Sequence, residues 1–310
     1  MTDRVHTSPN HLGIAAVERD TGLSKDTLRV WERRYGFPAP LRDASGERAY
    51  PDEQVEKLRL LRRLIDQGER PGRIVALPMP ELRSLLDESA GRQPRAPARP
   101  HPVEPFVEML RAHDVVGLRR QLRHSRERLG LARFVTEVVA PLNTLVGEGW
   151  MRGQLQVFQE HLYTESLQVV LRDAIAGIPA SGDAARPRVL LTTLPAEPHG
   201  LGLLMAEALL ALEGAHCVSL GVGTPLWDIV LAARAQCSDI VALSFSGYMN
   251  PTQTVDSLKE LRAKLPEQAA LWAGGAAPAL HRRPLPGVRP IASIGEIHAE
   301  LLAWRHAARP

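Results

Sequence analysis

A proline-dense segment divides this chain of 310 residues and excludes a single continuous fold. Residues 92–105 read RQPRAPARPHPVEP, with proline at every second or third position. Proline fixes φ and has no N–H to donate, so this density excludes helix and sheet and favours a semi-rigid tether. A second break, residues 179–187, is rich in Gly, Ser, Ala and Asp. We therefore expect an N-terminal domain at 1–80, a proline-rich linker at 81–105, a helical region at 106–180 and a C-terminal domain at 187–310.

Composition limits the function classes. The 38 basic and 35 acidic residues leave a net charge of only +3, so binding to nucleic acid must be argued from local pattern. Cys217 and Cys237 lie in apolar runs without CxxC spacing and are expected to be buried, reduced thiols. Met1 to Asn10 is polar, and no uncharged apolar stretch reaches the roughly 18 residues of a membrane span. These features predict a cytoplasmic protein.

Residues 12–78 alternate short helical patterns with turn signals. A first helix is expected to stop at Thr21-Gly22, and Ser24 is a good N-cap for a second helix. Residues 35–50 break the pattern with glycines and prolines, which indicates a β-type wing. A further amphipathic run follows and is expected to stop at Gly68.

Positive charge gathers on the second helix and the wing. Arg29 and Arg33 are four residues apart, so their guanidinium groups can reach base edges and phosphates of one groove. On charge alone, a solvated face of a small helical domain explains the pattern equally well. The residues predicted to contact DNA from the helix and its end are Lys25, Thr27, Arg29, Trp31, Arg33 and Arg34, and from the wing Arg42, Arg48 and Tyr50.

The order of these residues resembles the winged helix-turn-helix domain of the MerR family. That family has a T-L-R-x-W/Y-E-R-R-like run, a wing closing in G-x-R-x-Y, and a D/E-x-V helix start, and these stand here at residues 27–34, 46–50 and 52–55. The resemblance implies dimers that bind two-fold symmetric operator DNA. The long dimerisation helix of standard members is replaced by the proline linker, so oligomerisation must come from a downstream segment.

The hydrophobic period changes at Arg188. Short apolar runs at residues 189–191, 216–220, 240–245 and 270–273 alternate with helical stretches. This alternation predicts a doubly wound α/β fold with a parallel sheet. Ligands of such sheets bind at the carboxyl ends of the strands.

The loop after the first of these strands carries a carboxylate and a histidine. Glu197 stands two residues before His199, and Gly200 and Gly202 let a bulky planar ligand approach the backbone. A carboxylate in this place can hold the imidazole nitrogen that faces away from a metal. A lone histidine, however, is more often a structural group.

This loop resembles the D/E-x-H-x-x-G signature of cobalamin-binding domains. The other family motifs stand at the family's spacing: 41 residues separate Gly202 from Ser244, and 27 separate Ser246 from the glycine pair. The middle motif reads Ser-Phe-Ser where the family has S-x-L. The resemblance implies a Rossmann-like domain with His199 as lower axial ligand of cobalt, and with Glu197, Gly202, Ser244, Ser246, Gly274 and Gly275 around the cofactor.

The helical region at 106–180 is expected to be a four-helix bundle. In it, nine residues separate Trp150 from Glu160-His161. A core tryptophan and a solvated Glu-His pair would explain these residues without any ligand. The spacing nevertheless matches W-x9-E-H of CarH-type photoreceptors, which join a MerR domain, a bundle and a cobalamin module in this order. There the Trp and the Glu-His pair contact the adenosyl group above cobalt, and the bundle caps the upper face of the ring.

The CarH-type resemblance implies a light-responsive repressor. Adenosylcobalamin favours a DNA-binding homotetramer in the dark, and light breaks the cobalt–carbon bond, splits the tetramer and releases operator DNA. Known members have a histidine after the motif tryptophan that ligates cobalt in the light; Met151 stands there, which leaves water or another group such as His161 for that role. A thioether is a poor ligand for oxidised cobalt.

Two alternative functions remain. A light-independent cobalamin-sensing regulator is compatible with Met151. A corrinoid-carrying methyltransferase subunit is the alternative from another class, and it has no use for the arginines of the DNA-binding segment. The remaining sequence shows no nucleophile–base constellation, so we expect no catalytic turnover and no membrane association.

Overall fold

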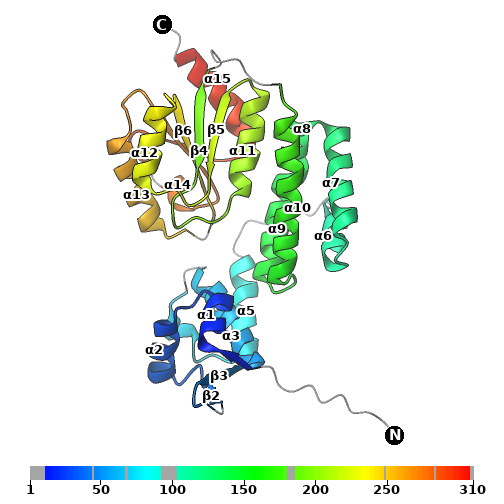
Figure 1. Ribbon diagram of the computed structural model, residues 1–310, viewed down its shortest axis with the longest axis vertical. Helices are drawn as coiled ribbons and strands as arrows, with labels where there is room; N and C mark the ends of the chain where they lie inside the picture. The colour runs from blue at the N-terminus through cyan, green and yellow to red at the C-terminus, as the bar shows by residue number, and fades with distance from the viewer. Residues whose placement is uncertain are drawn as a thin grey trace. The chain divides into compact units, whose positions relative to one another are not determined.

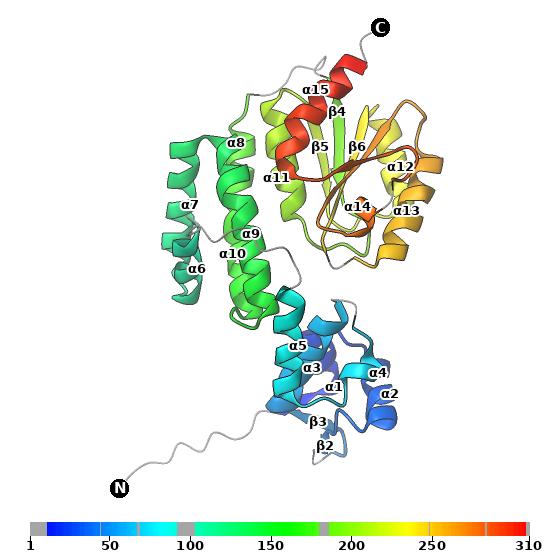
Figure 2. The ribbon, with the colours of Figure 1, turned by 180° about the vertical axis from the view of Figure 1, so that it is seen from behind.

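The computed structural model describes residues 11–43, 45–66, 69–91, 103–179, 186–247, 249–282 and 284–307. Its contacts divide the chain into two compact units, Met1–Pro97 and Ala98–Pro310. Figures 1 and 2 show both units from opposite sides. Each unit is described by itself below.

The first unit is a small helical domain with a three-stranded antiparallel sheet in the order β1-β3-β2. Ser24 caps α2 as predicted, because its side chain accepts a hydrogen bond from the backbone N–H of Thr27. Gly22 and Gly36 end α1 and α2 in left-handed conformations that only glycine adopts freely. The elements are β1 (His11–Gly13), α1 (Ile14–Thr21), α2 (Lys25–Tyr35), β2 (Leu41–Arg42), β3 (Arg48–Pro51), α3 (Asp52–Asp66), α4 (Pro71–Ile74) and α5 (Met79–Gly91).

The linker predicted at 81–105 is too long at both ends. Helix α5 occupies its first part, and Leu82 is fully buried in the core of the first unit. At the other end, α6 begins at Glu104, and Val103 already belongs to the core of the second unit. The proline-dense stretch 92–102 lies outside the described residues, as does the predicted helix stop at Gly68.

The second unit begins with the predicted helical region. Its elements are α6 (Glu104–Arg111), α7 (Val115–Leu129), α8 (Leu131–Arg133), the π-helical turn η1 (Phe134–Val139), α9 (Ala140–Met151) and α10 (Val157–Ala176). The π-helical turn η1 ends two residues before Pro141. Proline has no N–H to donate to the carbonyl one turn earlier, and that carbonyl belongs to the wider turn. Helices α8, η1 and α9 therefore follow one another without a loop despite the proline.

The α/β part of this unit is a five-stranded parallel sheet in the order β5-β4-β6-β7-β8. The four predicted strands are present, and the doubly wound fold is confirmed. The prediction that both cysteines are buried was wrong, because Cys217 is only partly buried and Cys237 is exposed. The fifth strand, β8, was not predicted because Arg289 and Pro290 interrupt its apolar pattern. The elements are β4 (Arg188–Thr192), α11 (Leu201–Leu212), β5 (His216–Gly221), α12 (Leu226–Ala235), β6 (Ile240–Phe245), α13 (Pro251–Lys264), β7 (Ala270–Gly275), α14 (Ala279–Arg282), β8 (Val288–Ile291), the 3-10 turn η2 (Ile294–Glu296) and α15 (Ile297–Ala307).

Helix α11 joins the bundle to the sheet. Leu204, Met205 and Ala208 belong to the bundle core, whereas Leu203 and Leu210 pack with the strands. A helix that is apolar on both faces is buried on both, which accounts for the sequence LGLLMAEALLAL. The bundle and the α/β part therefore share a packed junction along one helix.

In both views the turn between α9 and α10 lies at the same end of the second unit as the loops that follow the parallel strands (Figures 1 and 2). The chain path requires this arrangement. Helix α10 leads to the amino end of β4, so its own start lies at the other end, beside the strands' carboxyl ends. The candidate residues of the bundle and of the sheet are thus carried by the same end of this unit.

Candidate functional site

The strand order makes β4 a topological switch point of the sheet. This strand pairs with β5 on one side and with β6 on the other, so the chain leaves β4 first in one direction and later in the opposite one. The loops after β4 and β6 therefore diverge, and such switch points bind ligands in open α/β sheets. The register aligns Ser244 of β6 with Gly274 of β7. All three predicted motifs thus lie together at the carboxyl ends of the parallel strands.

Glu197 organises the loop between β4 and α11. Its side chain is fully buried, and Oε1 lies 2.5 Å from His199 Nδ1 and accepts the backbone N–H of His199 at 3.0 Å. Its other oxygen, Oε2, accepts the backbone N–H of Ser246 at 2.6 Å. One carboxylate thus fixes the histidine ring and ties the loop after β4 to the loop after β6.

Electrostatics keep this carboxylate charged. Burial by itself raises the pKa of Glu197, but hydrogen bonds from His199 and Ser246 outweigh it, and the pKa lies below its ordinary value. A carboxylate only accepts hydrogen bonds, so the neutral ring of His199 carries its hydrogen on Nδ1. Nε2 then has the lone pair that a metal ion requires. The imidazole is 54% exposed, so it can be reached from outside the protein.

Two buried threonines support the loop, and the sequence pattern did not single them out. Thr193 Oγ1 donates to the Glu197 carbonyl at 2.6 Å and accepts the N–H of Gly223 at 2.8 Å. Thr192 Oγ1 lies 2.7 Å from Thr224 Oγ1. Both threonines are completely buried at the end of an apolar strand. Their position at a strand end beside a glycine-rich loop is the signal that could have identified them.

Two glycines of the predicted motifs, Gly202 and Gly275, are required by close approaches. A Cβ at Gly202 would overlap Ser244 Oγ, so the start of α11 lies directly against the end of β6. Gly275 has φ +115°, and a Cβ there would overlap the carbonyl oxygen of Phe245. A Cβ at Gly274 would make only ordinary contacts with Ile291. The spacing that linked these motifs in the sequence corresponds to direct proximity in space.

The structure brings two of the three predicted bundle residues together. His161 Nδ1 lies 2.7 Å from Glu160 Oε2, and Thr164 Oγ1 donates to Glu160 Oε1 at 2.7 Å. The His161 side chain is 70% exposed. Trp150 lies in the last turn of α9, across the α9–α10 turn from this pair, and is partly buried.

A polar contact chain inside the unit joins three helices, and it was not predicted. The buried phenol of Tyr163 on α10 donates to Asn143 Oδ1 on α9. Asn143 Nδ2 in turn lies 3.1 Å from the sulfur of Met205 on α11. Burial raises the pKa of Tyr163 well above its ordinary value, so the phenol keeps its proton to donate. These contacts link the bundle to α11, the helix whose first turn contains Gly202.

In the first unit, α2 exposes the predicted arginines. Arg29, Arg33 and Arg34 are exposed, and Arg29 pairs with Asp26 at 3.3 Å. Lys25 pairs with Glu18 at 3.5 Å, and Thr27 is partly buried with its hydroxyl 2.8 Å from Ser24 Oγ. On the wing, exposed Arg42 donates to the Gly46 carbonyl at 2.9 Å. These residues form a basic surface on one helix and its neighbouring hairpin.

Of the residues predicted to contact DNA, two are buried and a third is held in an ion pair. Trp31 and Tyr50 are 5% and 0% exposed and pack in the core of the first unit, so they position α2 and the wing. Arg48 is only partly exposed, and its Nε donates to Glu32 Oε2 at 2.8 Å. This ion pair joins β3 to α2. An amphipathic pattern does not say which way the ring of Tyr50 faces, so its burial was not predicted.

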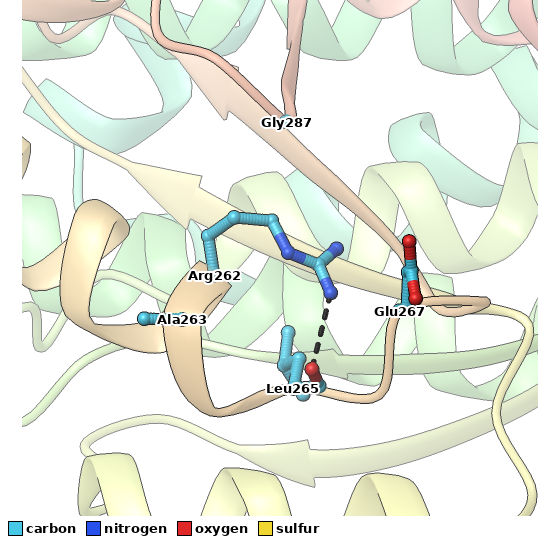
Figure 3. A pocket seen from close by; sticks show the side chains of 5 residues that line it. All are labelled: Arg262, Ala263, Leu265, Glu267 and Gly287. Atoms are coloured by element: carbon cyan, nitrogen blue, oxygen red, sulfur yellow. Dashed lines mark hydrogen bonds between the residues drawn. The ribbon is translucent and has the colours of Figure 1, made fainter.

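A cavity of about 380 Å³ lies away from this site. Figure 3 shows Arg262 reaching across it beside Leu265, Glu267 and Gly287. The Arg262 guanidinium donates to the carbonyls of Leu265, Pro266 and Ala269, which caps the end of α13. These residues precede β7 and β8, at the amino ends of the strands. The cavity therefore lies at the amino ends of the strands, opposite the end that carries the candidate site.

Metal-ligand groups and membrane-spanning helices were considered for the described ranges. No group of three or more His, Cys, Asp or Glu side chains there is arranged to hold a metal ion. A single histidine ligand to a cofactor metal needs no such group. Among the described helices, none combines the length and apolarity needed to cross a membrane.

Two family models match the chain. The MerR HTH family regulatory protein model matches residues 12–77. The B12 binding domain model matches residues 103–172, which hold α6 to α9 and most of α10.

Full-length relatives share both parts. The HTH-type transcriptional repressor CarH of Myxococcus xanthus is 34% identical over 84% of this chain and 87% of its own length. The repressor CarA of the same organism is 31% identical over 82% of this chain and 84% of its own. Among solved structures, the monomethylamine corrinoid protein of Methanosarcina barkeri has a TM-score of 0.52 at 14% identity, over 64% of this chain and 96% of that protein. This last likeness concerns the fold alone.

Proposed function

The chain belongs to the CarH family of transcriptional regulators, which combine a MerR-type domain with a B12-binding domain, and we propose that it is a light-responsive repressor. In this proposal it binds operator DNA as a homotetramer loaded with adenosylcobalamin in the dark. Light releases the DNA. The observation that carries the proposal is the His199–Glu197–Ser246 arrangement at the switch point of the sheet.

The site residues fit a corrinoid. His199 would ligate cobalt through Nε2, because Glu197 holds Nδ1. The close approaches of Gly202 to Ser244 and of Gly275 to Phe245 bring the loops after the strands together, and the nucleotide tail would lie beside Ser246 and Gly274. Trp150, Glu160 and His161 would face the upper ligand from the bundle. When bound, adenosylcobalamin supplies a cobalt–carbon bond that light breaks.

Helix α11 offers a route from the site to the bundle. Its first turn carries Gly202 against Ser244, and its middle packs into the bundle core through Met205. A ligand that fits only one arrangement of loops and bundle stabilises that arrangement and any assembly built on it. Dissociation of the assembly then weakens DNA binding through lost multivalency, with no change at the DNA-contacting residues.

A second candidate function is a cobalamin sensor that does not respond to light. Met151 follows Trp150 at the end of α9, where a thioether is a weak ligand for oxidised cobalt. We assign no catalytic turnover in either case. The two functions differ only in whether illumination changes the assembly.

Fluorescence anisotropy of labelled operator tests the proposal. The operator is selected from random duplexes with the full chain and adenosylcobalamin in the dark, and binding is compared before and after green light. We expect tight binding in the dark and at least a tenfold loss after illumination. His199→Ala should bind weakly in both conditions. His298→Ala is a matched control, because His298 forms a similar exposed pair with Glu213 at 2.8 Å far from the site.

The outcomes separate the candidates. Binding that requires the cofactor and ignores light supports the light-independent sensor. Binding that is equally tight without any corrinoid contradicts both. A His199→Ala variant that behaves like the wild type would show that the cobalt ligand lies elsewhere.

A further inference from the structure

We propose that Val30 is a specificity-determining residue that contacts the 5-methyl group of a thymine in the operator. The proposal rests on the DNA-binding function proposed above. It is carried by an apolar side chain at the centre of the exposed basic face of α2. Val30 is 41% exposed, whereas Leu28 and Trp31 of the same helix are 0% and 5% exposed.

Helix geometry determines which residues of α2 share a face with Val30. With 3.6 residues per turn, Asp26, Val30 and Arg33 fall on one stripe of α2, and Leu28 lies on the opposite side. Asp26 and Arg33 are exposed together with Val30. The stripe that faces outward therefore has a valine between an acidic and a basic residue.

The fold does not explain the valine. Its side chain takes no part in the core of the first unit, which contains Leu28 and Trp31. A β-branched residue also lowers helix propensity relative to alanine or arginine. The position therefore lies outside the buried core and is not a favourable one for helix stability, whereas the other exposed residues of this helix are charged.

The neighbours leave Val30 accessible to a base. Arg29 pairs with Asp26 at 3.3 Å, which holds its guanidinium along the helix toward the N-terminal turn. Arg33 lies one turn further on. In the major groove thymine alone presents a methyl group, and guanine offers the acceptors that arginine recognises. The stripe is therefore suited to a thymine next to a guanine in each half-site.

Replacing thymine by uracil tests this directly, because uracil lacks only the methyl group. The full chain, loaded with adenosylcobalamin in the dark, is titrated with its selected operator and with operators carrying uracil at one position per half-site. We expect one position at which uracil weakens wild-type binding about threefold to tenfold. Val30→Ala should bind the thymine operator as weakly as the wild type binds the uracil operator, and should not distinguish the two.

Val169→Ala is the matched control, since Val169 is 40% exposed on α10 of the other unit. It should retain the wild-type preference for thymine. Circular dichroism confirms that Val30→Ala is folded, as alanine is the better helix former. Equal binding of thymine and uracil operators by the wild type at every position overturns the inference, as does full discrimination by Val30→Ala. Failure to select any operator overturns the proposed function itself.

Discussion

Glu197 Oε2 lies 2.6 Å from the backbone nitrogen of Ser246, so a buried carboxylate in one loop is bonded to the main chain of another. The same carboxylate holds Nδ1 of His199 at 2.5 Å. Both partners are donors. The orientation of the imidazole and the separation of the two loops therefore depend on one side chain.

Glu197→Gln should weaken cobalamin binding about tenfold to a hundredfold. The amide keeps one acceptor but turns an NH2 group toward one of two donors, so His199 or Ser246 loses its bond. Equilibrium dialysis with adenosylcobalamin in the dark measures the change. Glu213→Gln, which alters the His298 pair, is the control and should bind normally. Unchanged affinity in Glu197→Gln would contradict the assigned orienting role.

The pH dependence of stability should have opposite signs at two carboxyl groups, the buried Glu197 and the partly buried Glu207. The pKa of Glu197 is lowered in the folded state, so its stabilisation is present above the unfolded value near 4.5 and is lost as pH falls through the folded value. Burial raises the pKa of Glu207 despite Arg172, so this residue favours folding below 4.5 and opposes it as pH rises through its folded pKa.

Urea unfolding followed by tryptophan fluorescence at several pH values measures both effects. At pH 7, Glu197→Gln should destabilise the protein by roughly 1–3 kcal/mol, and Glu207→Gln should stabilise it. Both differences should shrink below pH 4. Destabilisation by Glu207→Gln at pH 7 is the result that this account does not allow.

Gly202→Ala should weaken cobalamin binding because its Cβ would overlap Ser244 Oγ. Ser244→Gly removes that oxygen, so the double variant should recover part of the loss, as expected for residues in contact. Gly147→Ala is the control, because a Cβ on this helix residue meets nothing within 4 Å. Additive effects of the two substitutions would show that the contact does not shape the site.

Arg48 and Glu32 should act as one unit in DNA binding. Their 2.8 Å ion pair joins the wing to α2, so Arg48→Ala and Glu32→Gln should each weaken operator binding, and the double variant should be no worse than either. Arg42 is exposed, so Arg42→Ala should instead remove about one phosphate contact. The slope of log K against log salt concentration should then decrease by about one. Tighter binding by Glu32→Gln would mean that Arg48 contacts phosphate directly.

Local signals predicted much of this structure. Ser24 caps α2, Gly22 ends α1, and short apolar runs are the central strands, because these features depend on neighbouring residues. The Glu197–His199 contact was predicted for the same reason. Its bond to Ser246 was not, since it joins residues 49 positions apart.

The features that were not predicted depend on contacts between residues far apart in the sequence. Strand β8 is defined by pairing with β7, although Pro290 breaks its pattern. Tyr50 looks like a surface residue of a basic wing, yet the helices of its unit bury it completely. The contacts of Asn143 with Tyr163 and Met205 join three helices and have no local sequence signal.

Size-exclusion chromatography of the full chain, read at the corrinoid absorption bands, tests the central claim most directly. The protein is loaded with adenosylcobalamin in the dark, and one half is exposed to green light before the run. We predict that corrinoid elutes with a large assembly in the dark and with a smaller species after light, and that His199→Ala carries no corrinoid. Protein that elutes without corrinoid in the dark would contradict the account.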